Sequence, residues 1–339
     1  YSGGLTFGAE ILSIENIAIL AGDDTRFGAP GTGFYDYDLT LLDVNVAAGV
    51  QMIIDANRLR LGEDFTFNGS AETDGSFFIY GGSGVDKLTG GAKNDVFLFG
   101  AQGQWGSSDI LTGGGGIDQL ALRGDYVITF GANQLVGVEQ IAVVSAYDTR
   151  FGDLGDSYDY NLTMNDANVD GIQMTIDAAL LRSNEVLTFN GSAEDDGSFR
   201  VFGGSGTDFI QGSQNGDIIV GRERGDTLYG NGGNDVFRYN SIADSNSTER
   251  DGIQDFNAGD LIDLSRIDAN VLVDGDQAFS FIGNALFSGT AGELRFENYS
   301  NGGTVWLVQG DVDGNGFSDF EVILVINPAD PITASDFIL

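Results

Sequence analysis

Aspartates recur at fixed intervals beside glycine-rich turns, with a spacing typical of a cation-binding array. The pattern is Gly-Gly-x-Gly-x-Asp-x-U-x, in which U is a large apolar residue, and the stretch 203–238 holds four copies without a break. Glycines let a turn tighten so that its carbonyl oxygens converge on one point. The aspartate at position six adds a carboxylate, and such an all-oxygen cage suits Ca²⁺, which takes roughly 6–8 oxygen ligands at about 2.3–2.6 Å.

The same nonapeptide predicts the element that must hold the cage. Positions 1–6 form the turn, and positions 7–9 form a short strand whose U side chain points into a narrow apolar core. Two nonapeptides, or 18 residues, complete one coil, so that every second turn stacks on the same edge. Stacked turns then lie about 4.8 Å apart, the spacing of neighbouring strands. The aspartates of stacked turns should therefore face one another.

An earlier block of nonapeptides is less regular. Copies occupy 81–89, 90–98 and 113–121, and the stretch 99–112 interrupts them with an insertion that contains Trp105 and a degenerate copy at 104–112. The turns GSAETD (69–74) and GSAEDD (191–196) begin the two blocks, with Gly and Asp at positions one and six. A flexible Gly/Asp-rich linker is the alternative, but the apolar residue two places after each aspartate argues against it.

The chain also repeats itself over about 122 residues, since 65–86 match 187–208 at 16 of 22 positions. The first half of each repeat consists of short segments rich in Ile, Val, Phe, Tyr and Thr that alternate apolar and polar residues, as strands do. We therefore predict an all-β protein built from two copies of one unit, followed by a different ending from residue 239.

Composition excludes several classes of protein. The 339 residues include 52 glycines but no cysteine or histidine, so zinc sites of the usual type, iron–sulfur clusters and Cys- or His-dependent nucleophiles are absent. Asp and Glu outnumber Lys and Arg by 51 to 15, a net charge of −36 that repels nucleic acid and anionic membranes. No apolar run reaches the roughly 20 residues of a membrane helix.

The nonapeptides resemble the repeats of the RTX (repeats-in-toxin) calcium-binding proteins. That resemblance implies a right-handed parallel β-roll, in which each ion is bound by the Asp and the carbonyls of positions one and three of one turn. The Asp and the carbonyls of positions two and four of the next stacked turn complete the site. In the first block the implied ligands are Asp74, Gly81, Ser83, Gly84, Asp86, Gly90, Ala92, Asp95, Asp109, Gly113, Gly115 and Asp118. In the second block they are Asp196, Gly203, Ser205, Gly206, Asp208, Gly212, Gln214, Asp217, Gly221, Glu223, Asp226, Gly230, Gly232 and Asp235.

The resemblance also implies which aspartates share an ion. The implied pairs are Asp74–Asp95, Asp86–Asp109, Asp95–Asp118, Asp196–Asp217, Asp208–Asp226 and Asp217–Asp235.

The end of the chain resembles the C-terminal region of serralysin-type RTX proteins. The matching segments are 251–268, 310–325 and the final ITASDFIL. The resemblance implies a β-rich cap and an uncleaved signal for type I secretion, which the terminal sequence Asp336-Phe337-Ile338-Leu339 fits.

One loop near the end has the ligand spacing of an EF-hand-like site. Asp311, Asp313, Asn315 and Asp319 stand at positions 1, 3, 5 and 9, with glycine at position 6. Position 12, where such loops carry glutamate, is Val322. The segment could equally be a hairpin turn that needs no metal.

Other acidic and aromatic groups favour structural roles. We interpret Asp36/Asp38, Asp43/Asn45 and Asp166/Asn168 as solvated turns, with extra calcium or sugar contacts as the alternative. The paired Asp195 and Asp196 lack partner groups for acid–base chemistry, so no catalytic residue is predicted. The repeated aromatics Phe67/Phe189, Phe77/Phe199 and Tyr80/Phe202 favour core packing over a carbohydrate platform.

Together these patterns predict an all-β, right-handed parallel β-solenoid with RTX calcium β-roll segments and a β-rich C-terminal cap. The segments expected are an ion-poor coil at 1–68, a calcium roll at 69–121, an ion-poor coil at 122–190, a second calcium roll at 191–238, and the cap with the secretion signal at 239–339.

The predicted function is that of a non-enzymatic, calcium-stabilised extracellular scaffold, the C-terminal part of a surface-layer, adhesin or self-assembling protein. We expect several Ca²⁺ ions, a secreted or cell-surface location, contact with a type I secretion apparatus, and no nucleic-acid binding or membrane insertion. The alternatives are an accessory module of a secreted protease, lipase or polysaccharide-modifying enzyme, and a solenoid that binds polysaccharide.

Overall fold

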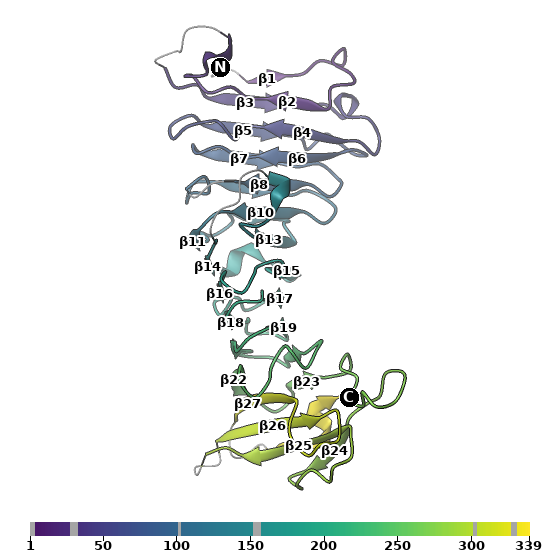
Figure 1. Ribbon diagram of the computed structural model, residues 1–339. Helices are drawn as coiled ribbons and strands as arrows, with labels where there is room; N and C mark the ends of the chain where they lie inside the picture. Colours follow the sequence, from purple (N-terminus) through teal and green to yellow (C-terminus); the bar gives the residue numbers. More distant parts are fainter. Residues whose placement is uncertain (1–3, 28–32, 101–102, 152–156, 301–303, 327–330) are drawn as a thin grey trace. The chain divides into compact units, whose positions relative to one another are not determined.

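A computed structural model of the chain describes residues 4–27, 33–100, 103–151, 157–300, 304–326 and 331–339 (Figure 1). Their regular structure consists of β-strands and short 3₁₀ turns, with no α-helix in the described ranges, so the all-β prediction is confirmed. None of the helical segments described there is long and apolar enough to cross a membrane. The chain divides into two compact units, Tyr1–Tyr158 with Asn165–Met174, and Asp159–Met164 with Thr175–Leu339.

Two parallel sheets form the frame of the first unit. One has the order β1 (Leu5–Thr6), β3 (Tyr37–Thr40), β5 (Phe65–Asn68), β7 (Asp86–Thr89), β9 (Ile110–Thr112) and β12 (Leu135–Val136). The other contains β2 (Asn16–Ala18), β4 (Gln51–Asp55), β6 (Ser76–Tyr80), β8 (Val96–Phe99), β10 (Gln119–Arg123) and β13 (Gln140–Val144). Because the chain alternates between the sheets, the strands up to β8 pair with the strand two places along, and β9 and β10 pair with β12 and β13, which makes a coil.

Shorter elements fill the first unit between these strands. They include β11 (Tyr126–Thr129) and the 3₁₀ turns η1 (Thr25–Phe27), η2 (Asp43–Asn45), η3 (Thr149–Phe151) and η4 (Asp166–Asn168). The strands β14 (Tyr160–Thr163) and β15 (Gln173–Asp177) lie where the sequence passes between the units.

The second unit is also a coil of parallel strands and ends in a different sheet. One side contains β17 (Ser198–Phe202), β19 (Ile218–Val220), β21 (Val236–Arg238), β23 (Leu261–Asp263) and, after the 3₁₀ turn η5 (Ala334–Asp336), β28 (Phe337–Ile338). The other contains β16 (Leu187–Asn190), β18 (Phe209–Gln211), β20 (Thr227–Tyr229), β22 (Asp251–Phe256), β27 (Phe320–Ile326), β26 (Val305–Asp311), β25 (Glu293–Asn298) and β24 (Ser280–Gly283).

The cap begins where parallel pairing gives way to antiparallel pairing. The strand β27 pairs parallel to β22 but antiparallel to β26, which in turn pairs antiparallel to β25. The terminal strand β28 pairs with β23 on the other side. These strands cover hydrogen-bonding groups that the last coil would otherwise leave open at a sheet edge. The predicted β-rich C-terminal cap is therefore confirmed.

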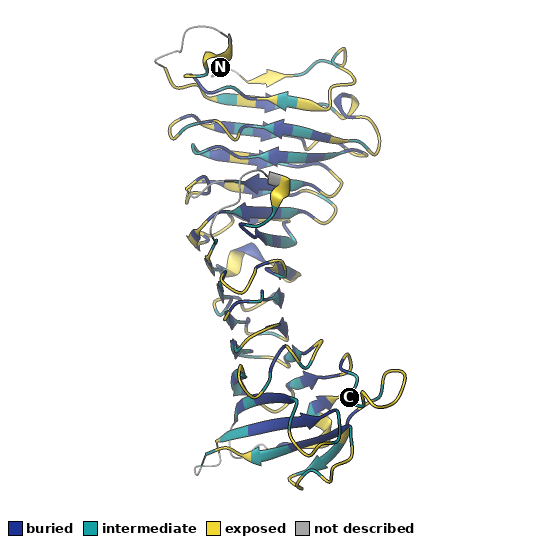
Figure 2. Ribbon diagram, in the orientation of Figure 1, coloured by how far each residue is buried: buried dark blue, intermediate teal, exposed yellow. Residues whose placement is uncertain are grey.

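The U residues of the nonapeptides build the core of each coil, as the period predicts. All eight are at most 1% exposed: Leu88, Phe97, Leu111, Leu120, Ile210, Ile219, Leu228 and Phe237. Figure 2 shows the same alternation of buried and more exposed residues along the strands. The strands β18, β20 and β21 each contribute one buried side chain with less buried residues on either side, whereas β8, β10 and β19 bury neighbouring residues as well.

Aromatic pairs support the coil that precedes each nonapeptide block. Phe67 meets Phe77 edge-on with ring centroids 5.1 Å apart, and Phe189 meets Phe199 in the same way at 5.0 Å. These pairs are core contacts, as predicted. Tyr80 differs, because it is half-buried on the outer face of β6 and packs beside Phe78 at 5.0 Å. Strand alternation places it there, since Phe77 and Ile79 already point inward.

The coils of the two units differ in length. Within the nonapeptides of the second unit stacked aspartates are 18 residues apart, the two-nonapeptide period, whereas in the first unit they are 23 apart. The longer coil contains Trp105, which packs between Phe99 at 5.1 Å and Phe130 at 5.6 Å. Strand pairing resumes beyond the insertion, with Leu88 of β7 opposite Leu111 of β9. The insertion therefore lengthens the coil without breaking the ladder.

Candidate metal centres

The nonapeptide aspartates of the second unit lie in two columns, one at each edge of the coil. In one column the backbone N–H of Asp208 donates to Asp226 Oδ1 at 2.7 Å. In the other the N–H of Asp217 donates to Asp235 Oδ1 at 2.8 Å. These are the Asp208–Asp226 and Asp217–Asp235 pairs of the sequence analysis, and the structure brings both together.

Both columns continue past the last nonapeptide. The N–H of Asp226 donates to Asp251 Oδ1 and that of Asp235 to Asp260 Oδ1, each at 2.9 Å and 25 residues along the chain. Neither Asp251 nor Asp260 was predicted as a ligand, because the intervening sequence leaves the nine-residue period. A signal was nevertheless present, since each is followed two places later by a buried isoleucine, Ile253 or Ile262.

The first unit has the same arrangement on its longer coils. The N–H of Asp86 donates to Asp109 Oδ1 at 2.8 Å, and that of Asp95 to Asp118 Oδ1 at 2.7 Å. The second of these columns ends at Glu139, whose Oε2 accepts from the N–H of Asp118 at 2.8 Å. Sequence predicted both aspartate pairs but not the glutamate.

The turns that begin the two blocks place a different acid in the interior. Asp74 and Asp196 are exposed, whereas Glu72 and Glu194 are fully buried. Glu72 Oε1 accepts hydrogen bonds from the N–H groups of Asp74 at 3.0 Å and Gly75 at 2.7 Å. The nonapeptide pattern assigns position six and so missed the longer glutamate at position four. Its recurrence in both GSAE segments was the available signal.

Glycine at position one of the turns leaves space where oxygens converge. A Cβ atom on Gly203 would lie 2.5 Å from the carbonyl oxygen of Gly221 and 2.6 Å from Asp208 Oδ2. A Cβ atom on Gly90 would lie 2.4 Å from the carbonyl oxygen of Gly113 and 2.2 Å from Asp95 Oδ2. Any side chain would fill the gap between these oxygens, so the glycines keep it open.

The other predicted carbonyl ligands lie in the same turns between strands. They are Gly81, Ser83, Gly84, Ala92 and Gly115 in the first unit, and Ser205, Gly206, Gly212, Gln214, Glu223, Gly230 and Gly232 in the second.

Burial makes these carboxyl groups hard to ionise. It raises the pKa of Asp86 to about 8, with the charge of Asp109 adding to the effect, and the pKa of Asp235 also to about 8. Burial raises the pKa of Asp208 and Asp217 to about 6. For the neighbours Asp226 and Asp251, burial is again the main cause of a strongly raised pKa. The folded chain therefore resists these negative charges unless a cation accompanies them.

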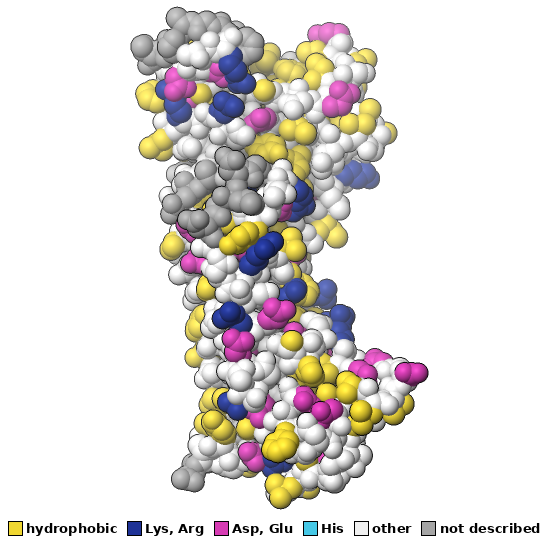
Figure 3. All heavy atoms as spheres, viewed as in Figure 1, with side chains coloured by type: hydrophobic (Ala, Val, Ile, Leu, Met, Phe, Trp, Pro, Cys, Tyr) yellow, Lys and Arg dark blue, Asp and Glu magenta, His cyan; other side chains and the backbone are white. Residues whose placement is uncertain are grey.

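No basic side chain of the described segments supplies that cation, since none of their ion pairs involves an aspartate of the columns. On the face drawn in Figure 3, acidic side chains are dispersed among other atoms rather than gathered into one patch.

Several carboxylate oxygens in the columns are buried without a hydrogen-bond partner. Asp86 Oδ1, Asp118 Oδ2, Asp226 Oδ2 and Asp251 Oδ2 are buried and have no hydrogen-bond donor. A buried anionic oxygen without a donor is costly unless a proton or a metal ion satisfies it. Carboxylate and carbonyl oxygens, with no nitrogen or sulfur donor, are the ligand set of Ca²⁺. The residues present therefore fit calcium.

The loop between β26 and β27 brings three further carboxylates together. Asp311, Asp313 and Asp319 offer oxygens that all lie within 4.8 Å of one another, and Asp311 is buried. Asp311 accepts from the N–H of Gly314 at 2.7 Å and of Gly316 at 2.9 Å, contacts that also stabilise a metal-free turn. Asn315 accepts instead from the N–H of Phe317 at 2.8 Å. Ion binding at this loop stays a prediction.

The fold and the acid columns define a parallel β-coil protein that stacks carboxylates along its edges. Comparison with protein families agrees: residues 187–339 match the model described as Peptidase M10 serralysin C terminal, and residues 78–102 match the RTX calcium-binding nonapeptide repeat (4 copies). A search of curated proteins found no significant match. The chain is an RTX protein with a serralysin-type C-terminal domain, and its nonapeptide repeats bind calcium.

Proposed function

We propose that this chain is a calcium-stabilised extracellular scaffold, the C-terminal part of a surface-layer, adhesin or self-assembling protein. The family matches identify a secreted RTX protein. The observation that supports the scaffold role is the repetition of one coil-forming unit, whose core and acid columns are organised for stacking. Repeated coils of this kind build long surfaces from nearest-neighbour contacts.

Calcium would couple the location of the protein to its folding. Ions that bind the folded chain and not the unfolded chain favour folding by mass action. Low calcium in the cytosol leaves the acid columns repelling one another, so the chain stays unfolded for export. High calcium outside the cell neutralises the columns and drives the coil to form.

Export by a type I system follows from the RTX and serralysin-type domains. We propose that Asp336 to Leu339 carry the signal. In the folded chain Phe337 of β28 pairs with Ile262 of β23, so the signal would be read before the chain folds.

Far-UV circular dichroism tests the calcium step. We expect a β-sheet spectrum in millimolar calcium and an unfolded spectrum in excess chelator, with folding restored when calcium returns. The same β spectrum in both conditions would refute the proposal. Electron microscopy of the calcium-loaded protein at rising concentration tests the scaffold role, for which ordered assemblies or surface attachment are expected.

A secreted enzyme that uses this chain as an accessory module is the second candidate. The observation that favours it is the C-terminal match, because the matching model describes the C-terminal part of a peptidase family. Assay of the full secreted protein for protease, lipase and polysaccharide-modifying activity separates the two candidates. We expect no activity from the present chain by itself.

A cell-surface polysaccharide is a partner that the first unit could accommodate. An open groove of about 500 Å³ is lined by Tyr80, Asn57, Asp55, Gln104 and Arg123, among others. A half-buried aromatic ring beside hydrogen-bonding groups is a combination that suits sugar rings. A glycan array compared between the parent and Tyr80→Ala tests this contact, and equal binding by the two would remove the groove from consideration.

A further inference from the structure

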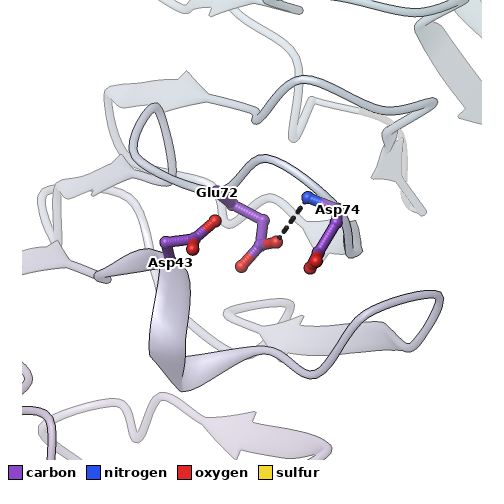
Figure 4. A group of neighbouring side chains, drawn as sticks. All are labelled: Asp43, Glu72 and Asp74. Atoms are coloured by element: carbon purple, nitrogen blue, oxygen red, sulfur yellow. Dashed lines mark hydrogen bonds between the residues drawn. The ribbon is translucent and has the colours of Figure 1, made fainter.

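The first unit has an acidic cluster that the nonapeptide columns do not explain. Asp43 begins η2, in the turn between β3 and β4, while Glu72 and Asp74 lie one coil further along, in the turn between β5 and β6. Each of the three offers a carboxylate oxygen, and the three oxygens lie within 4.8 Å of one another. Figure 4 shows the Glu72 carboxylate between those of Asp43 and Asp74. We propose that these three residues form a calcium site outside the nonapeptides.

The distance between the oxygens suits one shared ion. Two oxygens that bind the same Ca²⁺ at about 2.4 Å can be at most about 4.8 Å apart, when they lie on opposite sides of it. The spread observed in the cluster does not exceed this limit. Exposed Asp43 and Asp74 leave room for water molecules, which commonly complete the coordination of calcium.

Glu72, the buried member of the cluster, distinguishes it from an ordinary group of surface acids. Glu72 is 0% exposed, and its Oε2 is buried without a hydrogen-bond donor. Its other oxygen, Oε1, accepts from Asp74 and Gly75, which fixes the carboxylate in place. A buried carboxylate oxygen with no donor requires a cation or a proton.

The ion pairs of the described residues supply no basic partner for the cluster. Within the described segments, no Lys or Arg forms an ion pair with Asp43, Glu72 or Asp74. Asp43 is held close by Thr73, whose N–H and Oγ1 donate to Asp43 Oδ1 at 2.9 Å and 2.6 Å. Repulsion alone would favour separation of the three acids, but the fold brings them together.

This arrangement gives Asp74 a role different from the implied partnership with Asp95. An ion here would join η2 to the turn between β5 and β6, and so would tie the coil predicted to be ion-poor to the calcium roll that follows. The sequence of the second repeat carries Asp166, Glu194 and Asp196 at the matching positions. The same three acid types therefore recur, with 29 residues from Asp43 to Glu72 and 28 from Asp166 to Glu194, although neither glutamate belongs to the nonapeptide pattern.

Counting bound ions in single variants tests the site. Asp43→Asn is the decisive change, because Asp43 lies outside both nonapeptide blocks and Asn keeps the acceptor for Thr73. Asp38→Asn, an exposed acid of the neighbouring strand β3, is the matched control for loss of one charge. We expect Asp43→Asn and Asp74→Asn each to bind one calcium ion fewer than the parent and Asp38→Asn, by calorimetry and by metal analysis after dialysis.

The outcomes separate this inference from the proposed function. If the parent binds no calcium, both fail. If the parent binds calcium and Asp43→Asn binds as many ions with the same affinity, only the new site fails. Circular dichroism in calcium confirms that each variant is folded. Should a variant not fold, crystals of the parent grown in calcium decide the matter, because an anomalous scattering peak must lie between the three carboxylates, and its absence at saturating calcium overturns the site.

Discussion

The aspartates of the columns combine two opposing properties in one side chain. Each is buried, which disfavours its charge, and each belongs to a ladder in which the next acid lies one coil away. A metal ion reverses the balance, because it makes the charged form the favoured one. The buried carboxylate is therefore a penalty without calcium and a ligand with it, and two predictions follow at the scale of the residue.

The first concerns pH. In the folded chain burial raises the pKa of Asp86 and Asp235 to about 8, and that of Asp208 and Asp217 to about 6, whereas an unfolded aspartate titrates near about 3.9. A raised pKa favours the fold below the unfolded value, and that stability is lost as pH rises through the folded value. Without calcium, β structure should therefore increase as the pH is lowered from about 8 to about 5.5.

Circular dichroism after exhaustive dialysis measures this, since chelators such as EGTA weaken in acid. With calcium present the trend should reverse, because protons compete with the ion for the same oxygens. A calcium-free spectrum that does not change over this range would contradict the burial of the columns.

The second residue-scale prediction is that the substitution Asp226→Asn stabilises the fold without calcium and weakens calcium binding when the ion is present. Asp226 Oδ2 is buried without a donor between Asp208 and Asp251. Asp226→Asn removes a buried charge and keeps the shape, so without calcium at pH 8 the variant should be more folded than the parent. With calcium it should bind the ions more weakly, by roughly tenfold or more, because a charged ligand is lost.

Calorimetry and denaturation with and without calcium measure the two effects. Asp276→Asn, at an exposed position, controls for net charge and should change neither. Destabilisation of Asp226→Asn in both conditions would mean that Asp226 is a structural residue only.

At the scale of the element, Trp105 explains how a coil of 23 residues replaces one of 18. The side chain is 6% exposed and fills the space that the additional residues enclose, between Phe99 and Phe130. Trp105→Ala should lower the free energy of unfolding of the calcium-loaded chain by about 3–5 kcal/mol, whereas Trp105→Phe should lose clearly less. Urea denaturation in saturating calcium measures both, and a loss below about 1 kcal/mol would show that the insertion does not contribute to the core.

The sequence predicts best the elements in which the nine-residue repeat determines both the buried core residue and the position of the aspartate. Leu228 and Phe237 are core residues because each follows an aspartate by two places, and that spacing orients the strand as well as the turn. Where the period breaks, the prediction stops. Asp251 and Asp260 extend the columns from coils of other lengths, and Glu72 reaches the interior from another position of its turn. Three-dimensional stacking sets these positions, and sequence spacing alone does not reveal it.

At the scale of the whole molecule, each chain carries a net charge of −36, and its acidic groups repel one another. Such a charge keeps an unfolded chain expanded and soluble, a useful state for a protein exported before it folds. Calcium then removes much of the self-repulsion at the place where the fold is needed. In the proposed export route, secretion and folding would therefore depend on the same acidic residues.

The export step gives the last prediction. Removal of the last four residues, Asp336 to Leu339, should retain the protein inside its native host, because these residues form the proposed type I signal. Immunoblots of cells and medium measure this. Refolding of the purified truncated chain in calcium provides the control: if it folds while its export fails, the loss is one of recognition. Normal export of the truncated protein would exclude these residues as the signal.

The position of the terminal strand has a consequence for the direction of transport. Phe337 is only 7% exposed, its ring lies 5.2 Å from that of Phe281, and its strand hydrogen-bonds to β23. Folding therefore conceals Phe337, one residue of the segment that we propose the exporter must read, whereas Ile338 beside it stays 38% exposed. If the exporter must contact Phe337, a molecule that has folded in calcium outside the cell would no longer offer the complete signal to an exporter. Folding in the higher calcium concentration outside the cell would in this way make export irreversible.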